Sequence, residues 1–100
     1  MNKIYTCYKI TNTVNGKIYI GQTTKTVCVR WKQHVGTATW RMKDSTNLKA
    51  IHRAIRKYGA EQFIIEALVV TDNPLDISRI EQEQIALHDS LITNNRGYNM

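Results

Sequence analysis

The feature that most constrains the fold is a pair of short apolar runs joined by Asn15-Gly16. Asn-Gly between β-type runs is the strongest short signal of a hairpin, because both turn positions need a positive φ that these two residues tolerate best. We therefore predict a first strand from Ile4 to Asn12 and a second strand from Lys17 to Gly21.

Each of these strands carries one tyrosine, Tyr8 in the first and Tyr19 in the second. In a hairpin with a two-residue turn, Asn12 lies opposite Tyr19, and side chains two residues apart along a strand share a face. Tyr8 then points to the same side as Tyr19, whereas Ile20 points to the other side. We therefore expect both phenols on one face of the sheet.

The length and charge of the chain limit what it can do. Its 100 residues, 42% of them hydrophobic, make a single domain (1–100) with one modest core. Lysine and arginine outnumber aspartate and glutamate by 14 to 8, and the net charge of +6 favours a polyanionic partner, most commonly nucleic acid. No apolar run approaches the ~20 residues of a membrane span, so we expect no membrane partner.

The two cysteines, Cys7 and Cys28, are too few for a zinc site and form no Cys-x-x-Cys pair. A disulfide would require an oxidising compartment, which nothing else in the sequence indicates. We interpret both as reduced, buried small hydrophobes of a cytoplasmic protein.

A helix is predicted to follow the hairpin. Thr26 can cap it, Val27, Trp31 and Val35 recur at the spacing of one helix stripe, and Gly36 is the expected end.

Arg30 and His34 lie four residues apart on this helix and project side by side, next to the apolar stripe. An isolated pair of this kind is usually structural, with a solvated arginine and a histidine that caps helix carbonyls. Here the pair flanks the exit of the hairpin, which places two cation-capable groups near the phenols.

A second helix is predicted from Leu48 to Tyr58, with Ile51 and Ile55 on its buried stripe and Gly59 as its end. The polar connector before this helix contains Trp40, for which two roles are open, contact with nucleic acid and burial.

The face of the second helix opposite its buried stripe carries only cation-capable side chains: Lys49, His52, Arg53, Arg56 and Lys57. An ordinary solvated face would carry acids too, so we interpret this one as a phosphate-facing surface.

The run from Gln62 to Val70 is short, β-branched and almost continuously apolar, which predicts a central strand covered on both faces. A last helix then begins at Pro74, with Asn73 as its cap, and extends to about Ser90. The order of the elements is therefore β-β-α-α-β-α, an α/β arrangement of the α+β kind.

Glu81 falls in line with Ile77 and Ile85 on the last helix, not on its wet face. A carboxylate in an apolar line is disfavoured unless it pairs with a cation or binds a metal. Two interpretations stay open, a buried ion pair with Arg30 and a metal site. Glu83 is the competing candidate if the phase of the helix differs.

Several of these residues resemble the motifs of the GIY-YIG nucleases. Tyr19-Ile20-Gly21 matches the second half of that family's hairpin signature, and Tyr8 ends the first half, although Thr6-Cys7 stand in place of Gly-Ile. Further matches follow in the family's order along the chain: Arg30, His34, Lys57-Tyr58-Gly59, Glu81 and Gly97-Tyr98-Asn99. The resemblance implies a small, mainly antiparallel three-stranded sheet flanked by three helices, as in the catalytic domain of homing endonucleases.

The resemblance also implies a metal-dependent DNA endonuclease that hydrolyses phosphodiester bonds. Glu81 would be the ligand of one Mg²⁺ or Mn²⁺, ions that bind through few carboxylates and substrate phosphate. Arg30 would neutralise phosphate charge, and Asn99 would hydrogen-bond near the site. Tyr8 or Tyr19 would be the base, supported by His34, because a phenol of pKa about 10 needs nearby cations to act at neutral pH.

Contacts with DNA are expected from seven cationic residues: Lys17, Lys32, Arg41, Lys49, Arg53, Arg56 and Lys57. We expect a monomer in a bacterial or phage-infected cell, either trimmed from a longer chain with a C-terminal DNA-binding region or standing alone. Two alternatives are a basic nucleic-acid-binding module without catalysis and a repair-type DNA incision domain that shares the catalytic residues.

Overall fold

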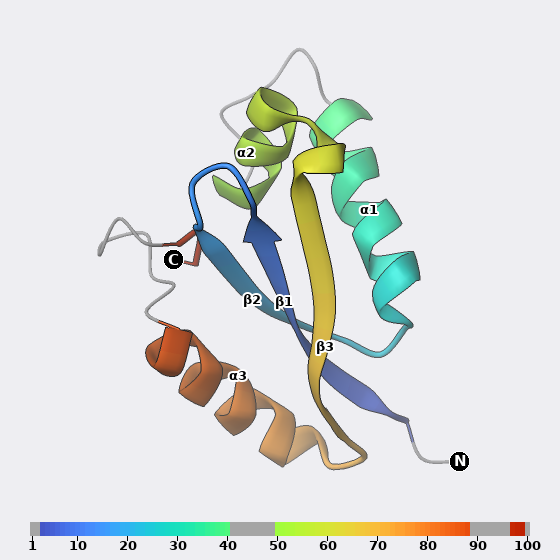
Figure 1. Cartoon of the computed structure of the whole chain (residues 1–100). Helices are drawn as coiled ribbons and strands as arrows, with labels where there is room; N and C mark the ends of the chain where they lie inside the picture. Colours follow the sequence, from blue (N-terminus) through green and yellow to red (C-terminus); the bar gives the residue numbers. More distant parts are fainter. Residues whose placement is uncertain (1–2, 41–49, 89–96, 100) are drawn as a thin grey trace.

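Three strands and three helices make up the described part of the chain, in the order predicted from the sequence (Figure 1). The computed structural model describes residues 3–40, 50–88 and 97–99, apart from the side chains at 39 and 40. The strands are β1 (Tyr5–Asn12), β2 (Ile18–Thr23) and β3 (Phe63–Thr71), and the helices are α1 (Val27–Trp40), α2 (Ala50–Tyr58) and α3 (Pro74–His88). A short 3-10 turn, η2 (Ala60–Gln62), precedes β3. No helix within these ranges is long and apolar enough to cross a membrane.

The sheet is antiparallel, as predicted, and its strand order is β2-β1-β3. β1 is therefore the central strand, and the prediction of a central strand at 62–70 is wrong. β3 lies at an edge, where the side chains of Ile64 and Val70 are 54% and 58% exposed. A continuous apolar run indicates a strand but not the number of its neighbours, because strand order is decided by how distant segments pack.

The hairpin is present, but its turn is longer than predicted. Tyr19 lies opposite Ile10 instead of Asn12, a shift of two residues in register. The connection between the strands contains Gly16 at φ 77°, and Asn12 closes it by donating its N–H to the carbonyl oxygen of Lys17 at 2.9 Å. Because side chains alternate with a period of two, an even shift leaves both tyrosines on the predicted face.

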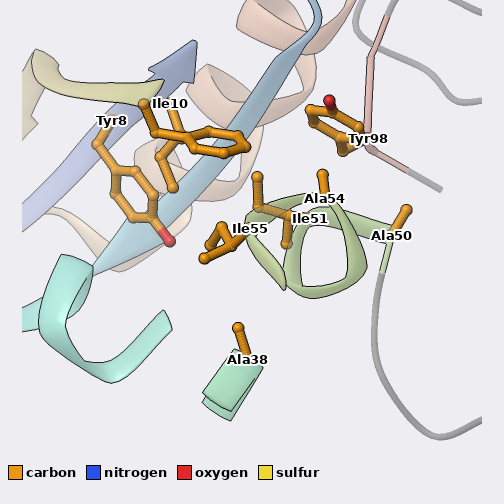
Figure 2. Packing of buried hydrophobic residues seen from close by; sticks show 9 residues of the cluster. Tyr8, Ile10, Ala38, Ala50, Ile51, Ala54, Ile55 and Tyr98 are labelled. Carbon is orange, nitrogen blue, oxygen red and sulfur yellow. The ribbon is translucent and has the colours of Figure 1, made fainter. Parts of the chain in front are cut away.

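One face of the sheet packs against α1 and α2. Tyr8 and Ile10 of β1 form a buried cluster there with Ile51 and Ile55 of α2 and with Phe63 of β3. Figure 2 shows the rings and aliphatic side chains of this cluster between β1 and the two helices.

The other face packs against α3. Ile77 and Ile85 of this helix are buried against Cys7 and Ile20 of the hairpin. Cys7 is fully buried, as predicted, so a small apolar side chain fills the position where the family signature has isoleucine. Cys28 is exposed, contrary to the prediction. It is the residue after Val27 on α1, one position away from the apolar stripe of the helix, so its side chain projects away from the core.

α1 begins as predicted but does not end at Gly36. The hydroxyl of Thr26 accepts the N–H of Val29 at 3.2 Å and so caps the helix. The helix continues through Gly36 to residue 40. A glycine inside a helix costs about 1 kcal/mol relative to alanine, and the burial of Ala38 in the core of α1 and α2 favours the continuation.

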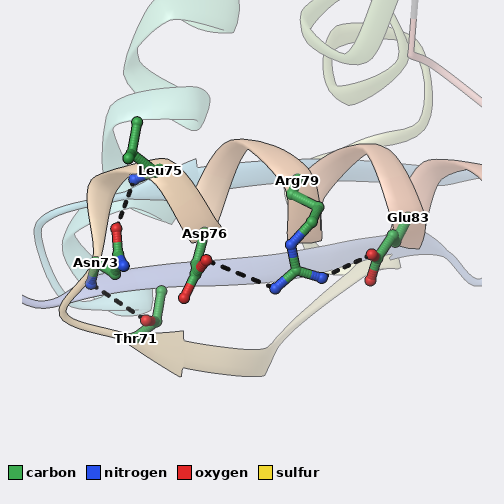
Figure 3. A network of polar contacts seen from close by, with 6 residues as sticks. All are labelled: Thr71, Asn73, Leu75, Asp76, Arg79 and Glu83. Atoms are coloured by element: carbon green, nitrogen blue, oxygen red, sulfur yellow. Dashed lines mark hydrogen bonds and ion pairs between the residues drawn. The ribbon is translucent and has the colours of Figure 1, made fainter.

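The C-terminus of α2 and the N-terminus of α3 lie where the sequence predicts them. Gly59 adopts φ 91° after α2 and donates its N–H to the carbonyl oxygen of Ile55 at 2.9 Å. Before α3, Asn73 Oδ1 accepts the N–H of Leu75 at 2.9 Å, with Pro74 at the first helical position (Figure 3). The expected start of α2 at residue 48, the expected end of α3 at residue 90 and the connector around Arg41 lie outside the described residues.

Candidate active site

Two phenols and one glycine form the centre of the site. Tyr8 and Tyr19 lie on the same face of the hairpin, with ring centroids 6.4 Å apart. Gly21 pairs with Tyr8 in the strand register, and a Cβ atom there would lie 2.5 Å from Cζ of Tyr8 and 3.0 Å from Cε2 of Tyr19. The site needs glycine at this position because the Tyr8 phenol occupies the space of a side chain.

α1 supplies two side chains that contact the Tyr8 hydroxyl. Arg30 Nε–H donates to Tyr8 Oη at 3.3 Å, and His34 Nε2 lies 2.8 Å from the same oxygen. The Tyr19 ring meets the His34 ring edge-on, with 5.6 Å between centroids. The predicted spacing of four residues therefore brings Arg30 and His34 together at the phenols.

Burial changes the acidity of both phenols. Desolvation raises the pKa of Tyr8 to about 12, the hydrogen bond from Arg30 opposes this effect, and the charges of Tyr19 and Glu81 add to it. Desolvation also raises the pKa of Tyr19, again opposed by Arg30 and increased by Glu81. Both side chains are therefore neutral phenols at neutral pH, and neither is a preformed phenolate.

Glu81 approaches this group from the other layer of the fold. It lies half-buried between Ile77 and Ile85, as predicted, on the helix that covers the opposite face of the sheet. Its charge nevertheless raises the pKa of Tyr8 and Tyr19, so it lies within electrostatic range of both phenols. Arg30, His34 and the tyrosines are in direct contact, whereas Glu81 acts on them through space.

The two candidate carboxylates on α3, Glu81 and Glu83, differ in their partners. No ion pair within residues 3–40, 50–88 and 97–99 includes Glu81, and Arg30 donates instead to Tyr8 and to Gln33 Oε1. Glu83 is bound at 2.7 Å by Arg79 on the exposed side of α3 (Figure 3). Glu81 is therefore the carboxylate that remains available to a ligand.

A model of the GIY-YIG catalytic domain matches residues 4–99 of the chain. The chain belongs to the GIY-YIG family. It is therefore an endonuclease, and the alternative of a basic module without catalysis is not supported.

Two solved structures resemble this GIY-YIG domain. The catalytic domain of the homing endonuclease I-TevI is 27% identical, with a TM-score of 0.73 over 100% of this chain and 98% of that one. A glutamate-to-alanine variant of the catalytic domain of the intron endonuclease I-TevI is 26% identical, with a TM-score of 0.73 over 95% of this chain and 92% of that one. No curated protein sequence matches the chain.

The donor set of this nuclease domain fits a hard divalent cation. GIY-YIG nucleases generally depend on a divalent metal. Within the described residues, no three His, Cys, Asp or Glu side chains gather at one point, as a structural zinc site would require. Mg²⁺ needs only one or two carboxylates, since it keeps several waters and binds substrate phosphate. Glu81 can supply the carboxylate.

Two hollows in the nuclease surface carry cationic side chains. One, of about 320 Å³, opens beside Arg30 and is also lined by Lys25 and Gln33. The other, of about 270 Å³, brings together Lys17, Arg53 and Lys57, three of the residues predicted to bind DNA. Of the remaining four, Lys32 and Arg56 are exposed on α1 and α2, whereas Arg41 and Lys49 lie outside the described residues.

The last described residues, 97–99, form hydrogen bonds with the hairpin. Asn99, which is buried, accepts the N–H of Ile20 at 2.8 Å and donates to the carbonyl oxygen of Ile20 at 2.7 Å. Tyr98 Oη accepts from Asn12 Nδ2 at 3.0 Å. Asn99 therefore holds the backbone between Tyr19 and Gly21, next to the site.

The prediction that His52 lies on the solvent-exposed face of α2 is wrong. His52 is buried, and its Nε2 lies 2.9 Å from Nδ1 of His34. The signal was available in the sequence, because Leu48, Ile51, His52 and Ile55 follow the i, i+3, i+4, i+7 pattern of a buried helix face. The polar character of histidine favours an exposed position, whereas the place of His52 in this pattern predicts burial.

Proposed function

We propose that this GIY-YIG domain hydrolyses DNA phosphodiester bonds with Tyr8 as the general base, Arg30 as the phosphate-binding cation and Glu81 as the ligand of one divalent metal. The observation that carries the proposal is the environment of Tyr8 Oη, which contacts a guanidinium N–H and an imidazole nitrogen. A base in this reaction must accept a proton from water and pass one on. Tyr8 has a partner for the second step, and Tyr19 has none among the described residues.

The base step moves two protons together. The attacking water gives a proton to Tyr8 Oη as the phenolic proton passes to His34 Nε2, and the water oxygen forms its bond to phosphorus. Because burial raises the pKa of Tyr8 to about 12, very little phenolate forms at neutral pH, and we expect the transfer to His34 to accompany the transfer from water. The P–O bond to the leaving oxygen breaks, and that oxygen takes a proton from the solvent.

Arg30 is suited to bind the phosphate under attack. Its guanidinium has five N–H donors, of which the described contacts to Tyr8 and Gln33 use two. The hollow of about 320 Å³ beside it can admit phosphate oxygens. The fixed planar fork stabilises the charge that grows on these oxygens.

Glu81 would hold the metal, which when bound would polarise a phosphoryl oxygen and stabilise charge on the leaving oxygen. The half-buried carboxylate has no ion-pair partner in the described chain, so its oxygen atoms are available as ligands. Its negative charge also keeps both phenols protonated, because it adds to the rise in their pKa.

DNA would extend from this centre across the cationic hollow formed by Lys17, Arg53 and Lys57. These residues come from the hairpin turn and from α2, so their convergence is produced by the fold. Phosphate contacts of this kind give affinity without sequence preference and weaken as salt rises. They would hold the duplex while the phenols and Arg30 act on one phosphate.

The proposal is tested by plasmid nicking in Mg²⁺ with Glu81→Gln, Arg30→Lys and the control Glu83→Gln. We expect Glu81→Gln and Arg30→Lys to slow nicking by about 10²- to 10³-fold, because each removes charge or geometry that stabilises the transition state. Glu83→Gln loses only an exposed ion pair and should stay within about 2-fold, since such pairs contribute little. Nicking by Glu81→Gln at the parent rate would refute the assignment of the metal ligand.

Substrate choice is a separate question within the same activity. A panel of intact duplexes and duplexes with a mismatch or flap, cut by the same preparation, compares a homing-type with a repair-type nuclease. We expect cutting of intact duplex DNA, in keeping with the resemblance to the I-TevI catalytic domain. Cutting confined to distorted duplexes would favour the repair type.

A further inference from the structure

Two buried histidines from different helices form a hydrogen-bonded pair behind Tyr8. His34 of α1 is 0% exposed and His52 of α2 is 7% exposed. His34 Nδ1 lies 2.9 Å from His52 Nε2, and His34 Nε2 lies 2.8 Å from Tyr8 Oη. The three side chains therefore form one continuous row from β1 to α2.

The direction of these hydrogen bonds follows from the burial of Tyr8. Tyr8 is 1% exposed, and the described partners of its hydroxyl are Arg30 Nε and His34 Nε2. Arg30 can only donate, so the phenolic hydrogen has one acceptor within the described part of the chain, the Nε2 lone pair of His34. A buried hydroxyl without an acceptor is disfavoured, because it loses its hydrogen bond to water and gains none in the protein. Tyr8 is thus the donor to His34.

This direction determines the tautomers of both imidazoles. A neutral imidazole whose Nε2 accepts carries its hydrogen on Nδ1. His34 Nδ1–H then donates to His52 Nε2, and His52 in turn carries its own hydrogen on Nδ1. The opposite arrangement would leave the Tyr8 hydrogen without an acceptor.

We infer that His52 is a positioning residue of the nuclease, which holds His34 in the Nδ1–H tautomer and shares the proton that His34 receives from Tyr8. The structural half stands alone, and the catalytic half rests on the proposed role of Tyr8 as base. When the phenolic proton arrives on His34 Nε2, the proton on Nδ1 can move to His52 Nε2. The added positive charge is then spread over two rings, and the proton returns to the solvent after the cut.

The surroundings of the pair influence where this proton resides. Tyr8 and Tyr19 face it from the hairpin, and both are neutral phenols. Arg30, one turn before His34 on α1, opposes a second positive charge nearby. The negative charge of Glu81 on α3 acts on the same phenols through space and favours a positive charge beside them. The charges of Arg30 and Glu81, both of which act on Tyr8, therefore oppose each other in their effect on a proton beside it.

The tautomers can be read directly by NMR of protein labelled with ¹⁵N-histidine, without any nuclease activity. We expect correlations that place hydrogen on Nδ1 and leave Nε2 unprotonated in both His34 and His52 at neutral pH. The variant His52→Gln, whose amide oxygen can accept from His34 Nδ1–H, should keep the His34 tautomer. Hydrogen on Nε2 of His34 in the parent protein would overturn the inference.

The catalytic half is tested by the pH dependence of kcat for His52→Leu and His52→Gln, with Ile51→Val as control. We expect His52→Leu to lower kcat by about 10- to 100-fold, the size of effect seen when a group that orients a metal-bound histidine is removed, with KM changed less than about 2-fold. Its acidic limb should move to lower pH, because a single buried ring takes up a proton less readily than the pair. His52→Gln should fall between the parent and His52→Leu.

Ile51→Val, a buried substitution on the same helix that leaves the pair intact, should change stability but not the profile. A uniform loss for His52→Leu at every pH, with the limb unmoved, would show a merely structural role. If Tyr8→Phe retains full activity while the tautomers are as expected, the proposed base is wrong and the histidine pair is not. The two failures are therefore distinguishable.

Discussion

Gly21→Ala tests whether the space of a side chain at Gly21 is occupied by the Tyr8 phenol. The added Cβ would lie 2.5 Å from Cζ of Tyr8 and 3.0 Å from Cε2 of Tyr19, whereas real Cβ atoms essentially never approach within 3.0 Å. Tyr8 is fully packed in the cluster under α1 and α2, so its ring cannot move without disturbing the core. Either the phenol or the backbone of β2 must shift.

The size of the effect can be estimated from these contacts. Inserting a methyl group into a packed interior costs about 1–3 kcal/mol. A displaced Tyr8 also loses its alignment with Arg30 Nε and His34 Nε2, now at 3.3 and 2.8 Å. A misplacement of about 1 Å in a catalytic group can cost about 10²-fold in rate. We therefore expect a rate loss larger than the loss of stability alone would cause.

The assay combines plasmid nicking in Mg²⁺ with urea unfolding for Gly21→Ala and Gly36→Ala. Gly36 lies in the exposed interior of α1, and a Cβ there meets no atom within 4 Å. The same substitution there should stabilise by up to about 1 kcal/mol and leave nicking unchanged. Parent-like nicking and stability in Gly21→Ala would refute the close packing of Tyr8 against β2.

Three further predictions concern single groups. The pKa of Tyr8 is near 10 in the unfolded chain but about 12 in the folded protein. The unfolded state therefore loses this proton first, and the free energy of unfolding falls by roughly 2–3 kcal/mol as the pH rises through this interval. Tyr8→Phe should lessen that alkaline loss, measured by urea unfolding at pH 8 and 11. Asn99→Ala should lower stability by about 1–3 kcal/mol, because it leaves two backbone groups of Ile20 without their side-chain partner; an unchanged urea midpoint would contradict this. Exposed Cys28 should react with a thiol reagent in the folded protein, whereas buried Cys7, whose pKa is raised to about 11 by desolvation and by Glu81, should react only on unfolding.

Local pattern was enough to predict which face of the hairpin and of α1 and α3 carries the side chains of the site. The alternation of the hairpin placed both tyrosines on one side, and this survived an error in the turn because the register moved by an even number. The helical spacing of Arg30 and His34 brought both to Tyr8, and that of Ile77, Glu81 and Ile85 kept the carboxylate off the wet face. These features depend on periods of 2 and 3.6, which neighbouring residues define by themselves.

Only the tertiary structure decided which distant segments meet. The strand order that puts β3 at an edge, the hydrogen bond between His34 and His52 and the two hydrogen bonds of Asn99 to Ile20 join residues 18 to 79 positions apart. It also decided that Glu81 approaches from the opposite layer and acts on the phenols through charge. Such pairings depend on how the faces pack against one another, and a periodic pattern shows that a side chain is buried without showing what it is buried against.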